Sequence, residues 1–421
     1  MPMKRVILAI SDHTDGGAAV ACRRLVEALR ARGNDRVIWL AMAGRPGVSD
    51  ILLSDWPGLP GVLLHRLSFR FKSAGNAILG NFFARCRTWG MERDALRMVR
   101  RLKPDLVHLH NIHAASFRLA ERLPAGLPLV WTLHDIWLLT GYCVYSYECQ
   151  KYADGCRGEC PQSGKWGEAS FPPDREWNRR QRFFRRNRDR IVLVSPSRWL
   201  AECAARRFGA LARVEQAPYG VPLAVFKPVD RAKAREVLGL PGRRPVILTG
   251  ACSLDETRKG AAFLSQAVNR LRPALAPVVV AFGAPPRSTP LPEGWLFPGT
   301  IHDEELLNLY YNAADVYALP SMADNLPNTL IESLAAGTPC ATFDTGGCAD
   351  VVRDGVTGYV AKRGDVEDLA RCLSRLLDRT ADDKETMRQN CRRIATEEYG
   401  IESQGTRYEA IYGQLLRPTG G

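Results

Sequence analysis

Two carboxylates frame the part of this 421-residue chain that is best suited to chemistry. The segment 320–337 reads PSMADNLPNTLIESLAAG, with Asp324 just before a predicted helix and Glu332 eight positions later, inside it. Asn325 and Pro327 are typical of a helix start. A helix that begins just past the end of a strand offers N–H groups to a phosphate, and a carboxylate can bind ribose hydroxyls. The pair therefore predicts one elongated ligand held at two ends, unless Asp324 is only a helix-start residue and Glu332 only a solvated one.

The segment SLDETRKGAAFL supplies positive charge for such a phosphate. Lys259 lies at a predicted strand-to-helix junction, where it faces a ligand unless it is an ordinary surface lysine. Arg258 is adjacent, and its role stays open because neighbouring residues on a helix point to different faces. Near the N-terminus, Gly16 and Gly17 follow the first predicted strand and open a helix. Backbone without side chains can approach an anion or a sugar closely there.

Histidines end two further predicted strands. The strand PLVWTLH closes on His134, followed by Asp135, at the edge of a sheet where such folds place ligands. His134 is either a ligand contact or a core histidine that Asp135 satisfies. His110, Asn111 and His113 lie at the end of another strand, HLHNIH, and are open between a ligand-binding and a structural role.

Four of the twelve cysteines cluster within residues 141–161. Cys143, Cys149, Cys156 and Cys160 have the spacing C-x5-C-x6-C-x3-C, which is looser than that of a zinc ribbon. A structural zinc and four reduced, unligated thiols are both open. The other cysteines are scattered singly in apolar surroundings and are typical of core residues in a reducing compartment.

Short apolar strands and amphipathic helices alternate almost from end to end, and these elements must position the polar residues. Such alternation predicts open, doubly wound parallel sheets of the α/β class. The first series of expected strands covers 4–10, 36–41, 105–110, 128–134 and 190–195. Turn residues crowd together at 216–227 and interrupt it. A second series follows at 245–250, 277–283, 315–320 and 339–344.

The interruption divides the chain into two Rossmann-like domains. We expect an N-terminal domain over 1–217, with the cysteine-rich stretch 141–161 as an insertion. The C-terminal domain is expected over 218–400. The last segment, 401–421, is expected to form a helix that crosses back to the N-terminal domain.

The carboxylate segment and the glycines after it resemble a known signature. It belongs to the retaining glycosyltransferases that include sucrose synthase and many bacterial surface-polysaccharide enzymes, the group 1 glycosyl transferases. In that family two glutamates, eight positions apart, precede Gly-Thr-Pro and a Gly-Gly loop. This chain has Asp324 and Glu332, then Gly-Thr-Pro at 337–339 and Gly-Gly at 346–347. The resemblance runs over nearly the whole chain and implies the GT-B architecture, two Rossmann-like domains facing across a cleft.

The resemblance also implies which residues bind a nucleotide-diphosphate-sugar. Glu332 would bind the ribose, and Asp324 would hold hydroxyls of the donor sugar, aided by backbone amides near Asn325 and Leu326. Lys259 is similar to the family's phosphate-binding lysine. Aspartate in place of the family's first glutamate leaves the identity of the donor sugar open.

Other parts of the resemblance are looser. The family's arginine ahead of the phosphate-binding lysine is absent here, since Ala251 and Cys252 occupy that stretch, and Arg258 is the potential substitute. Gly16 and Gly17 match the glycine loop that faces the diphosphate. In the N-terminal domain the family's histidine, here His134, touches the donor sugar. We assign His110, Asn111 and His113 to the acceptor side.

The reaction that the resemblance implies is transfer of a sugar, with retention, to a hydroxyl of a growing polysaccharide or lipid-linked oligosaccharide. The departing diphosphate would help to deprotonate the acceptor hydroxyl, while Lys259, Arg258 and helix N-termini stabilise its charge. No Asp-x-Asp motif lies at a plausible strand end, so we expect no cofactor in catalysis. A nucleotide-sugar epimerase and a non-catalytic nucleotide-sugar-binding protein on the same fold are the alternatives.

The net charge of +13 and a pI near 9.3 predict anionic partners. Basic segments with aromatic residues, 62–103 and 175–190, are suited to an anionic membrane that presents a polyprenyl-diphosphate-linked acceptor, or they form a solvated basic face. No base-stacking or zinc-finger motif indicates nucleic acid, so we expect no such partner. The apolar N-terminal run turns polar at once, as a first strand does and a signal peptide does not. We expect a cytoplasmic protein, peripheral on the inner face of the cell membrane.

Overall fold

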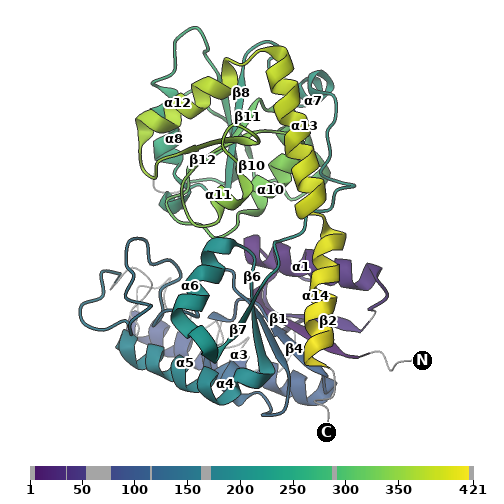
Figure 1. The fold of residues 1–421 in the computed structure, drawn as a ribbon, viewed down its shortest axis with the longest axis vertical. Helices are drawn as coiled ribbons and strands as arrows, with labels where there is room; N and C mark the ends of the chain where they lie inside the picture. Colours follow the sequence, from purple (N-terminus) through teal and green to yellow (C-terminus); the bar gives the residue numbers. More distant parts are fainter. Residues whose placement is uncertain are drawn as a thin grey trace.

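Two α/β units lie one beyond the other, each built around its own parallel sheet (Figure 1). The computed structural model describes residues 5–34, 36–53, 77–113, 116–162, 172–286 and 292–416, with the side chains of 77–87 outside the description. The two series of strands expected from the sequence form these two sheets, so the predicted α/β class with two parallel sheets is confirmed. The exact domain boundaries stay a prediction.

The N-terminal sheet contains the strands β1 (Ile7–His13), β2 (Val37–Ala43), β3 (Ile51–Leu52), β4 (Leu106–Leu109), β5 (Leu129–Thr132), β6 (Ile191–Ser195) and β7 (Arg213–Gln216). Their order is β3-β2-β1-β4-β5-β6-β7, and every pairing is parallel. Ile7 of β1 pairs with both Val37 of β2 and Leu106 of β4. Because helices cover both faces, the central strands are continuous apolar runs.

The helices of this domain are α1 (Gly17–Ala31), α3 (Ala77–Leu102), α4 (Arg118–Arg122), α5 (Pro173–Asn187) and α6 (Arg198–Phe208), with 3-10 turns η3 (Arg188–Arg190) and η4 (Gly209–Leu211). The Ser197 hydroxyl caps α6 by accepting a hydrogen bond from the Leu200 amide at 3.1 Å. Of the basic segment predicted over 62–103, α3 accounts for the C-terminal part, and residues 62–76 lie outside the described residues.

The C-terminal sheet contains β8 (Val246–Ser253), β9 (Val278–Ala284), β10 (Leu296–Gly299), β11 (Val316–Leu319), β12 (Cys340–Phe343) and β13 (Gly358–Ala361), in the order β10-β9-β8-β11-β12-β13. Its helices are α7 (Arg231–Val237), α8 (Ala261–Val268), α9 (Glu304–Ala313), α10 (Asn328–Ala335), α11 (Cys348–Val351), α12 (Val366–Leu377) and α13 (Ala381–Glu398), with a 3-10 turn η5 (Thr257–Lys259). The order places β8 beside β11, so the loops that follow these two strands lie close together.

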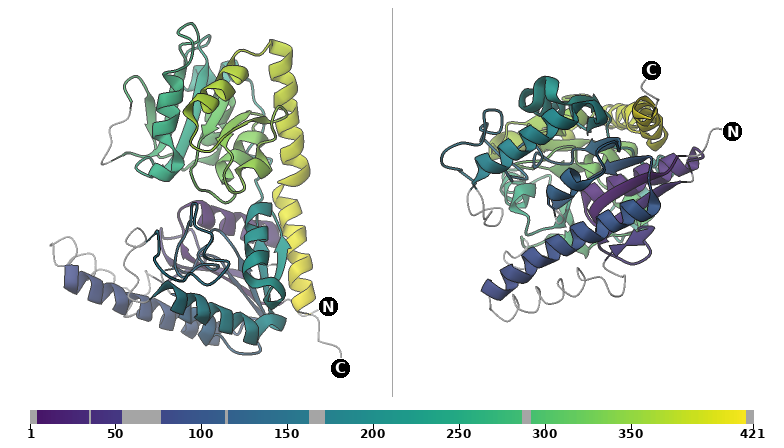
Figure 2. Two further views of the ribbon diagram at one scale, coloured as in Figure 1. Left: turned by 60° about the vertical axis from the view of Figure 1, so that its left-hand side comes forward. Right: turned by 90° about the horizontal axis from the view of Figure 1, so that it is seen from below.

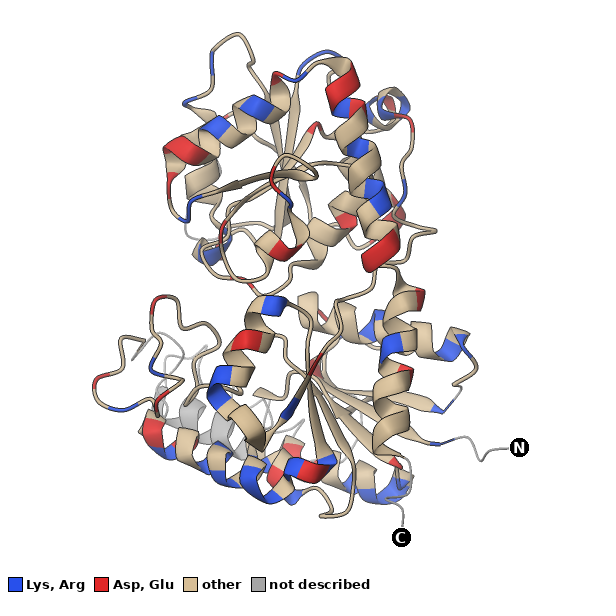
Figure 3. Ribbon diagram, in the orientation of Figure 1, with Lys and Arg blue, Asp and Glu red and all other residues tan. Residues whose placement is uncertain are grey.

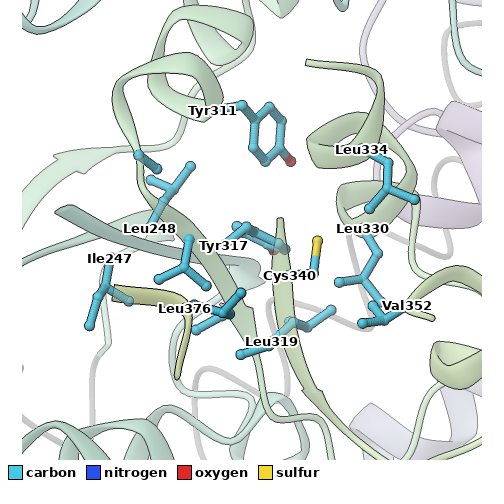
Figure 4. Packing of buried hydrophobic residues seen from close by; sticks show 14 of the residues in the cluster. Ile247, Leu248, Tyr311, Tyr317, Leu319, Leu330, Leu334, Cys340, Val352 and Leu376 are labelled. Atoms are coloured by element: carbon cyan, nitrogen blue, oxygen red, sulfur yellow. The ribbon is translucent and has the colours of Figure 1, made fainter. Parts of the chain in front are cut away.

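Apolar side chains from these strands and helices pack into one continuous core in the C-terminal domain. Figure 4 shows Leu248 and Leu319 of the sheet together with Leu330 and Leu334 of α10. Tyr311 stands at the edge of this cluster, and its hydroxyl oxygen is visible in Figure 4. The core fixes α10, the helix that carries Glu332, firmly against the sheet.

A final helix, α14 (Ile401–Leu415), follows α13 and lies against the N-terminal domain. Figure 2 shows α13 and α14 along one side of both domains. Tyr408 and Tyr412 of α14 are buried in the N-terminal core beside Leu25 of α1. Within the described residues, every helix is too short or too polar to span a bilayer.

Candidate functional site

A lysine–aspartate pair lies where the neighbouring strands β8 and β11 end. The Lys259 ammonium donates to Asp324 Oδ2 at 2.6 Å, and the Ser321 hydroxyl donates to the same oxygen at 3.2 Å. Burial raises the pKa of Asp324, but the charges of Lys259 and Arg258 outweigh burial, so this pKa lies below its usual value. The buried carboxylate is therefore ionised at neutral pH.

Arg258 converges on the same carboxylate. One of its terminal nitrogens lies 3.3 Å from Asp324 Oδ2 and donates to the Ala323 carbonyl at 2.6 Å. Neighbouring residues of an α-helix would point to different faces, but Arg258 and Lys259 lie in the 3-10 turn η5. Both can therefore reach one carboxylate. Arg258 also pairs with Glu256. A diphosphate here would exchange carboxylate partners of the two cations for phosphate oxygens.

Two helix N-termini meet beside this pair. Asn328, the first residue of α10, donates through Nδ2 to the carbonyl of Gly17 at 2.8 Å, and Gly17 begins α1. The positive ends of both helix dipoles therefore converge at the boundary between the domains. Gly16 and Gly17, which the sequence predicted to face a ligand, thus lie beside the segment that carries Asp324 and Glu332.

Glycines allow the surrounding loops to approach Asp324 closely. Gly346 has a φ of +54°, and a Cβ there would lie 1.8 Å from the Asp324 carbonyl oxygen. Gly260 has a φ of +80°, and a Cβ there would lie 1.9 Å from the Pro320 carbonyl oxygen. A side chain at either position would displace the loop that carries Asp324.

The residue type of Asn325 predicted that it starts the helix, but the structure shows otherwise. Pro327 is the N-cap of α10, and the Asn325 side chain instead crosses to the N-terminal domain. Its Nδ2 donates to the carbonyls of Leu133 and His134 at 3.1 and 3.2 Å, and its Oδ1 accepts from the Ser197 hydroxyl at 2.5 Å. Asn325 therefore links the two domains, because the three hydrogen bonds of its side chain all reach the N-terminal domain. The Leu326 side chain packs into the C-terminal core.

Glu332 is buried, and both of its carboxylate oxygens have protein partners. The Tyr311 hydroxyl donates to Oε2 at 2.9 Å, and Arg24 lies 2.8 Å from Oε1. Arg24 also contacts Glu304 at 3.0 Å, and its side chain is only 2% exposed. Because Arg24 belongs to α1 and both glutamates to the C-terminal domain, this cluster is a charged contact across the domain boundary.

Sequence reasoning missed Arg24, although a signal was present. On α1, Arg24 falls among the buried positions Ala21, Leu25 and Ala28, so a charged residue occupies the apolar face of an amphipathic helix. An arginine in such a place needs an acidic partner, because burying an unpaired charge is very unfavourable. The partner could not have been named without the placement of the two domains.

Three buried histidines, on or just after β4 and β5, form a network of hydrogen bonds and ring contacts, in which the ring centres of His108 and His110 lie 4.2 Å apart. His134 Nδ1 lies 2.6 Å from the Tyr219 hydroxyl, and its Nε2 lies 2.9 Å from His110 Nδ1. His108 contacts Thr132 at 2.7 Å and Tyr412 of α14 at 2.8 Å. Burial and the neighbouring histidines lower the pKa values of all three, that of His108 to about 3. They are neutral at physiological pH, and both ring nitrogens of His134 already have protein partners.

If His134 were a core histidine satisfied by Asp135, the two side chains would form a hydrogen bond. They do not. Asp135 Oδ1 accepts from the Trp137 amide at 2.8 Å, and its Oδ2 lies 3.5 Å from His113 Nε2. Asn111 accepts a hydrogen bond from the Asp12 amide through its carbonyl at 2.8 Å. His113 and His110 thus both lie beside the strand end of His134. The assignment of His110, Asn111 and His113 to the acceptor side stays a prediction.

The four clustered cysteines are free thiols in a loop without regular helix or strand. Burial, and then the nearby thiols of Cys160 and Cys156, raise the pKa of Cys143 to about 12. Across the residues that the structure describes, no set of three or more His, Cys, Asp or Glu side chains is arranged to hold a metal ion. A structural zinc held by Cys143, Cys149, Cys156 and Cys160, one of the two alternatives left open by the sequence, stays a hypothesis.

The same loop reaches the C-terminal domain. The Arg258 guanidinium lies 4.4 Å from the centre of the Tyr145 ring, and Arg363 forms an ion pair with Glu148. The loop thus places an aromatic ring against Arg258, one of the two cations beside Asp324.

Taken together, two parallel-sheet domains with their strand ends and helix N-termini meeting at a shared boundary define a GT-B protein. The profile of Glycosyltransferase Family 4 matches residues 15–225, and that of Glycosyl transferases group 1 matches residues 244–379. The chain belongs to glycosyltransferase family 4.

Curated relatives include D-inositol 3-phosphate glycosyltransferases. That of Nocardia farcinica is 28% identical over 291 residues, 65% of this chain and 58% of the relative. That of Streptosporangium roseum is 32% identical over 215 residues, 46% of this chain and 48% of the relative. The chain therefore spans about half the length of the curated relatives that it matches.

Solved structures share the fold over nearly the whole chain. Sucrose-phosphate synthase from Thermosynechococcus elongatus has a TM-score of 0.70 at 20% identity, over 98% of this chain and 99% of its own. Anabaena HepE in complex with UDP and glucose has a TM-score of 0.65 at 16% identity, over 97% of this chain and 100% of its own. WaaG, a glycosyltransferase involved in lipopolysaccharide biosynthesis, has a TM-score of 0.64 at 16% identity, over 99% and 100%.

Proposed function

We propose that this chain is a retaining glycosyltransferase that moves a sugar from a nucleotide-diphosphate-sugar to a hydroxyl of a growing polysaccharide or lipid-linked oligosaccharide. The observation that carries the proposal is the arrangement of α10. The Lys259–Asp324 pair lies just before its N-terminus, and buried Glu332 lies one turn inside it. This spacing suits a donor whose sugar and phosphates lie near the pair and whose ribose lies near Glu332.

The reaction breaks the bond between the anomeric carbon and the diphosphate oxygen and forms a bond to the acceptor oxygen on the same face of the sugar. The acceptor proton passes to the departing diphosphate. Lys259, Arg258 and the N-termini of α1 and α10 stabilise the charge on that leaving group. Asp324 orients sugar hydroxyls, and no cofactor takes part. The neutral network around His134 gives the donor pocket an uncharged wall.

The donor site is tested by a thermal-shift screen with UDP, GDP, ADP and CMP on wild type and Glu332→Gln. One diphosphate is expected to stabilise the wild type, by about 2.7 kcal/mol at a concentration of 100 Kd, and to lose most of this effect in the variant. UDP is tried first, because the HepE structures contain UDP and UDP-glucose. Glutamine is preferred to alanine because it keeps the volume beside Arg24.

Glu305→Gln is the matched control, since Glu305 is exposed and next to Glu304. It should leave the shift unchanged. If no diphosphate stabilises the wild type, the donor-site proposal fails. If the donor is turned over without any acceptor, the epimerase alternative replaces the transferase. If the nucleotide sugar binds but is never turned over, a non-catalytic binding protein is the better assignment.

An anionic membrane is the surface at which we place the acceptor, on the cytoplasmic face. Helix α5 carries a row of exposed arginines, while Arg180 on its inner face is buried against Phe117 and Trp137. Figure 3 shows basic residues along α5 at the end of the molecule away from the C-terminal domain. The exposed members are Arg175, Arg182, Arg185 and Arg186. Their spacing keeps most of them on one face of the helix.

Changing Arg182, Arg185 and Arg186 together to glutamine is expected to weaken binding to phosphatidylglycerol vesicles more than 100-fold, at about 1 kcal/mol per charge. Co-sedimentation at low and high salt measures this, and salt should weaken the wild type in the same direction. Replacing the exposed Arg243, Arg371 and Arg393 of the C-terminal domain removes the same charge and should have little effect. If both triple variants lose the same amount of vesicle binding, the basic face of α5 is a solvated surface and not a membrane-binding one.

A further inference from the structure

A recess on the C-terminal domain gathers cations that the proposed transfer does not use. Its charged lining comprises Arg231, Asp315, Arg379, Lys384 and Arg388. Asp315 directly precedes β11, whereas Asp324 follows it, so the recess and the candidate donor site lie at opposite ends of one strand. Figure 1 shows α13, which carries Lys384 and Arg388, beginning at the end of this domain that points away from the N-terminal domain.

The single carboxylate of the recess is already saturated. Asp315 lies 2.8 Å from Arg231 and 2.7 Å from Arg235, and it accepts the Val246 amide at 2.8 Å. Lys384 donates to the Leu377 carbonyl at 2.8 Å, and Arg379 donates to the Tyr359 hydroxyl, so both of these cations have neutral partners. Positive charge therefore exceeds negative charge in a small space.

Arg388 sharpens this imbalance. One of its terminal nitrogens is buried and has no hydrogen-bond partner among the residues that the structure describes. Burial, followed by the charge of Arg231, lowers the pKa of Arg388. An unsatisfied buried donor costs about 1–3 kcal/mol, and more when it is charged. An anionic oxygen would satisfy this donor and offset the repulsion between the two arginines.

We propose that the recess binds an oxyanion, either inorganic phosphate or the phosphate of a phosphomonoester. The empty space of the recess amounts to about 240 Å³, which includes the solvent at its mouth. A phosphate at the mouth can thus place one oxygen beside Arg388 and its others beside Arg379 and Lys384.

Isothermal titration of the full chain with inorganic phosphate tests the site. The wild type is expected to bind, and Arg388→Met and Lys384→Gln should each weaken the Kd at least tenfold. Arg388→Met removes an unsatisfied donor, so it should fold, and Lys384 is only half-buried. Arg371→Met, an exposed change on the neighbouring helix α12, should keep the wild-type Kd.

Phosphate can also bind at the candidate donor site, so Lys259→Met is titrated in parallel and should retain recess binding. Unchanged binding in both recess variants, or loss in Lys259→Met alone, would overturn the proposal. Glycerol 3-phosphate separates the two sources. Tighter binding than inorganic phosphate assigns the recess to a phosphorylated metabolite, and equal or weaker binding assigns it to free phosphate.

Discussion

Replacing Lys259 with methionine is expected to lower donor turnover by about 100- to 1,000-fold. Lys259 is the cation closest to Asp324, and the transfer proposed above needs positive charge where the diphosphate departs. Removal of one well-placed group that stabilises developing charge commonly has an effect of this size. The assay is release of the nucleoside diphosphate from the nucleotide sugar that the thermal-shift screen identifies. Lys259→Arg keeps the charge and should lose less.

Removal of Lys259 should also change how stability depends on pH. In the wild type the lowered pKa of Asp324 stabilises the fold above the usual value of 3.8, and this contribution is lost as pH falls through the lower folded-state pKa. In Lys259→Met only the charge of Arg258 and the hydrogen bond from Ser321 oppose burial, so the Asp324 pKa should rise above 3.8. The variant should then lose stability relative to wild type as pH rises, which urea unfolding between pH 4 and 7 measures.

Lys233→Met is the matched control for both measurements, because Lys233 is an exposed lysine of α7 remote from Asp324. It should change neither turnover nor the pH dependence of unfolding. A Lys259→Met enzyme with wild-type turnover would remove Lys259 from the phosphate site, whatever the nucleotide screen had found. A variant with normal nucleotide binding but slow turnover would instead place its effect on the transition state.

The sequence allowed the ends of strands to be identified, but not which strands are neighbours. Lys259 and Asp324 could both be placed after strands, yet they meet only because β8 lies beside β11 in the sheet. His110 and His134 meet for the same reason, since β4 pairs with β5. Alternating strands and helices predict a parallel sheet, whereas strand order depends on packing between distant segments.

The sequence predicted that the last helix crosses back to the N-terminal domain, but not which of its residues make the contacts. Tyr412 lies 304 positions from His108 in the chain, and no local pattern pairs them. Asn325 is of a residue type that is common at helix starts. Because Pro327 is the N-cap of α10, the Asn325 side chain instead links the two domains. The cysteine spacing predicted that the four thiols lie near one another, but ligand geometry depends on side-chain directions that spacing does not fix.

Arg24→Met is expected to tighten nucleoside diphosphate binding about tenfold. If Glu332 binds the ribose, Arg24 competes with the nucleotide for that carboxylate and holds α1 against the C-terminal domain until the two domains separate. Removing the competitor frees one oxygen of Glu332 without touching its hydrogen bond from Tyr311. A tenfold change corresponds to about 1.4 kcal/mol, well within the range of a coupling between a domain contact and a ligand.

Arg23→Met separates this effect from a general loss of charge. Arg23 is the neighbour of Arg24 on α1. It pairs with Glu304 at 2.5 Å and with Glu27 at 3.0 Å, and not with the carboxylate proposed to bind the ribose. Titration calorimetry should therefore give a wild-type Kd for Arg23→Met and a lower Kd for Arg24→Met. X-ray scattering of the nucleotide-free proteins should show the Arg24 variant as the more open of the two. If Arg24→Met instead binds the nucleotide more weakly, Arg24 contacts the ligand itself, and the contact with Glu332 is a resting position of a donor-binding arginine and not a competitor.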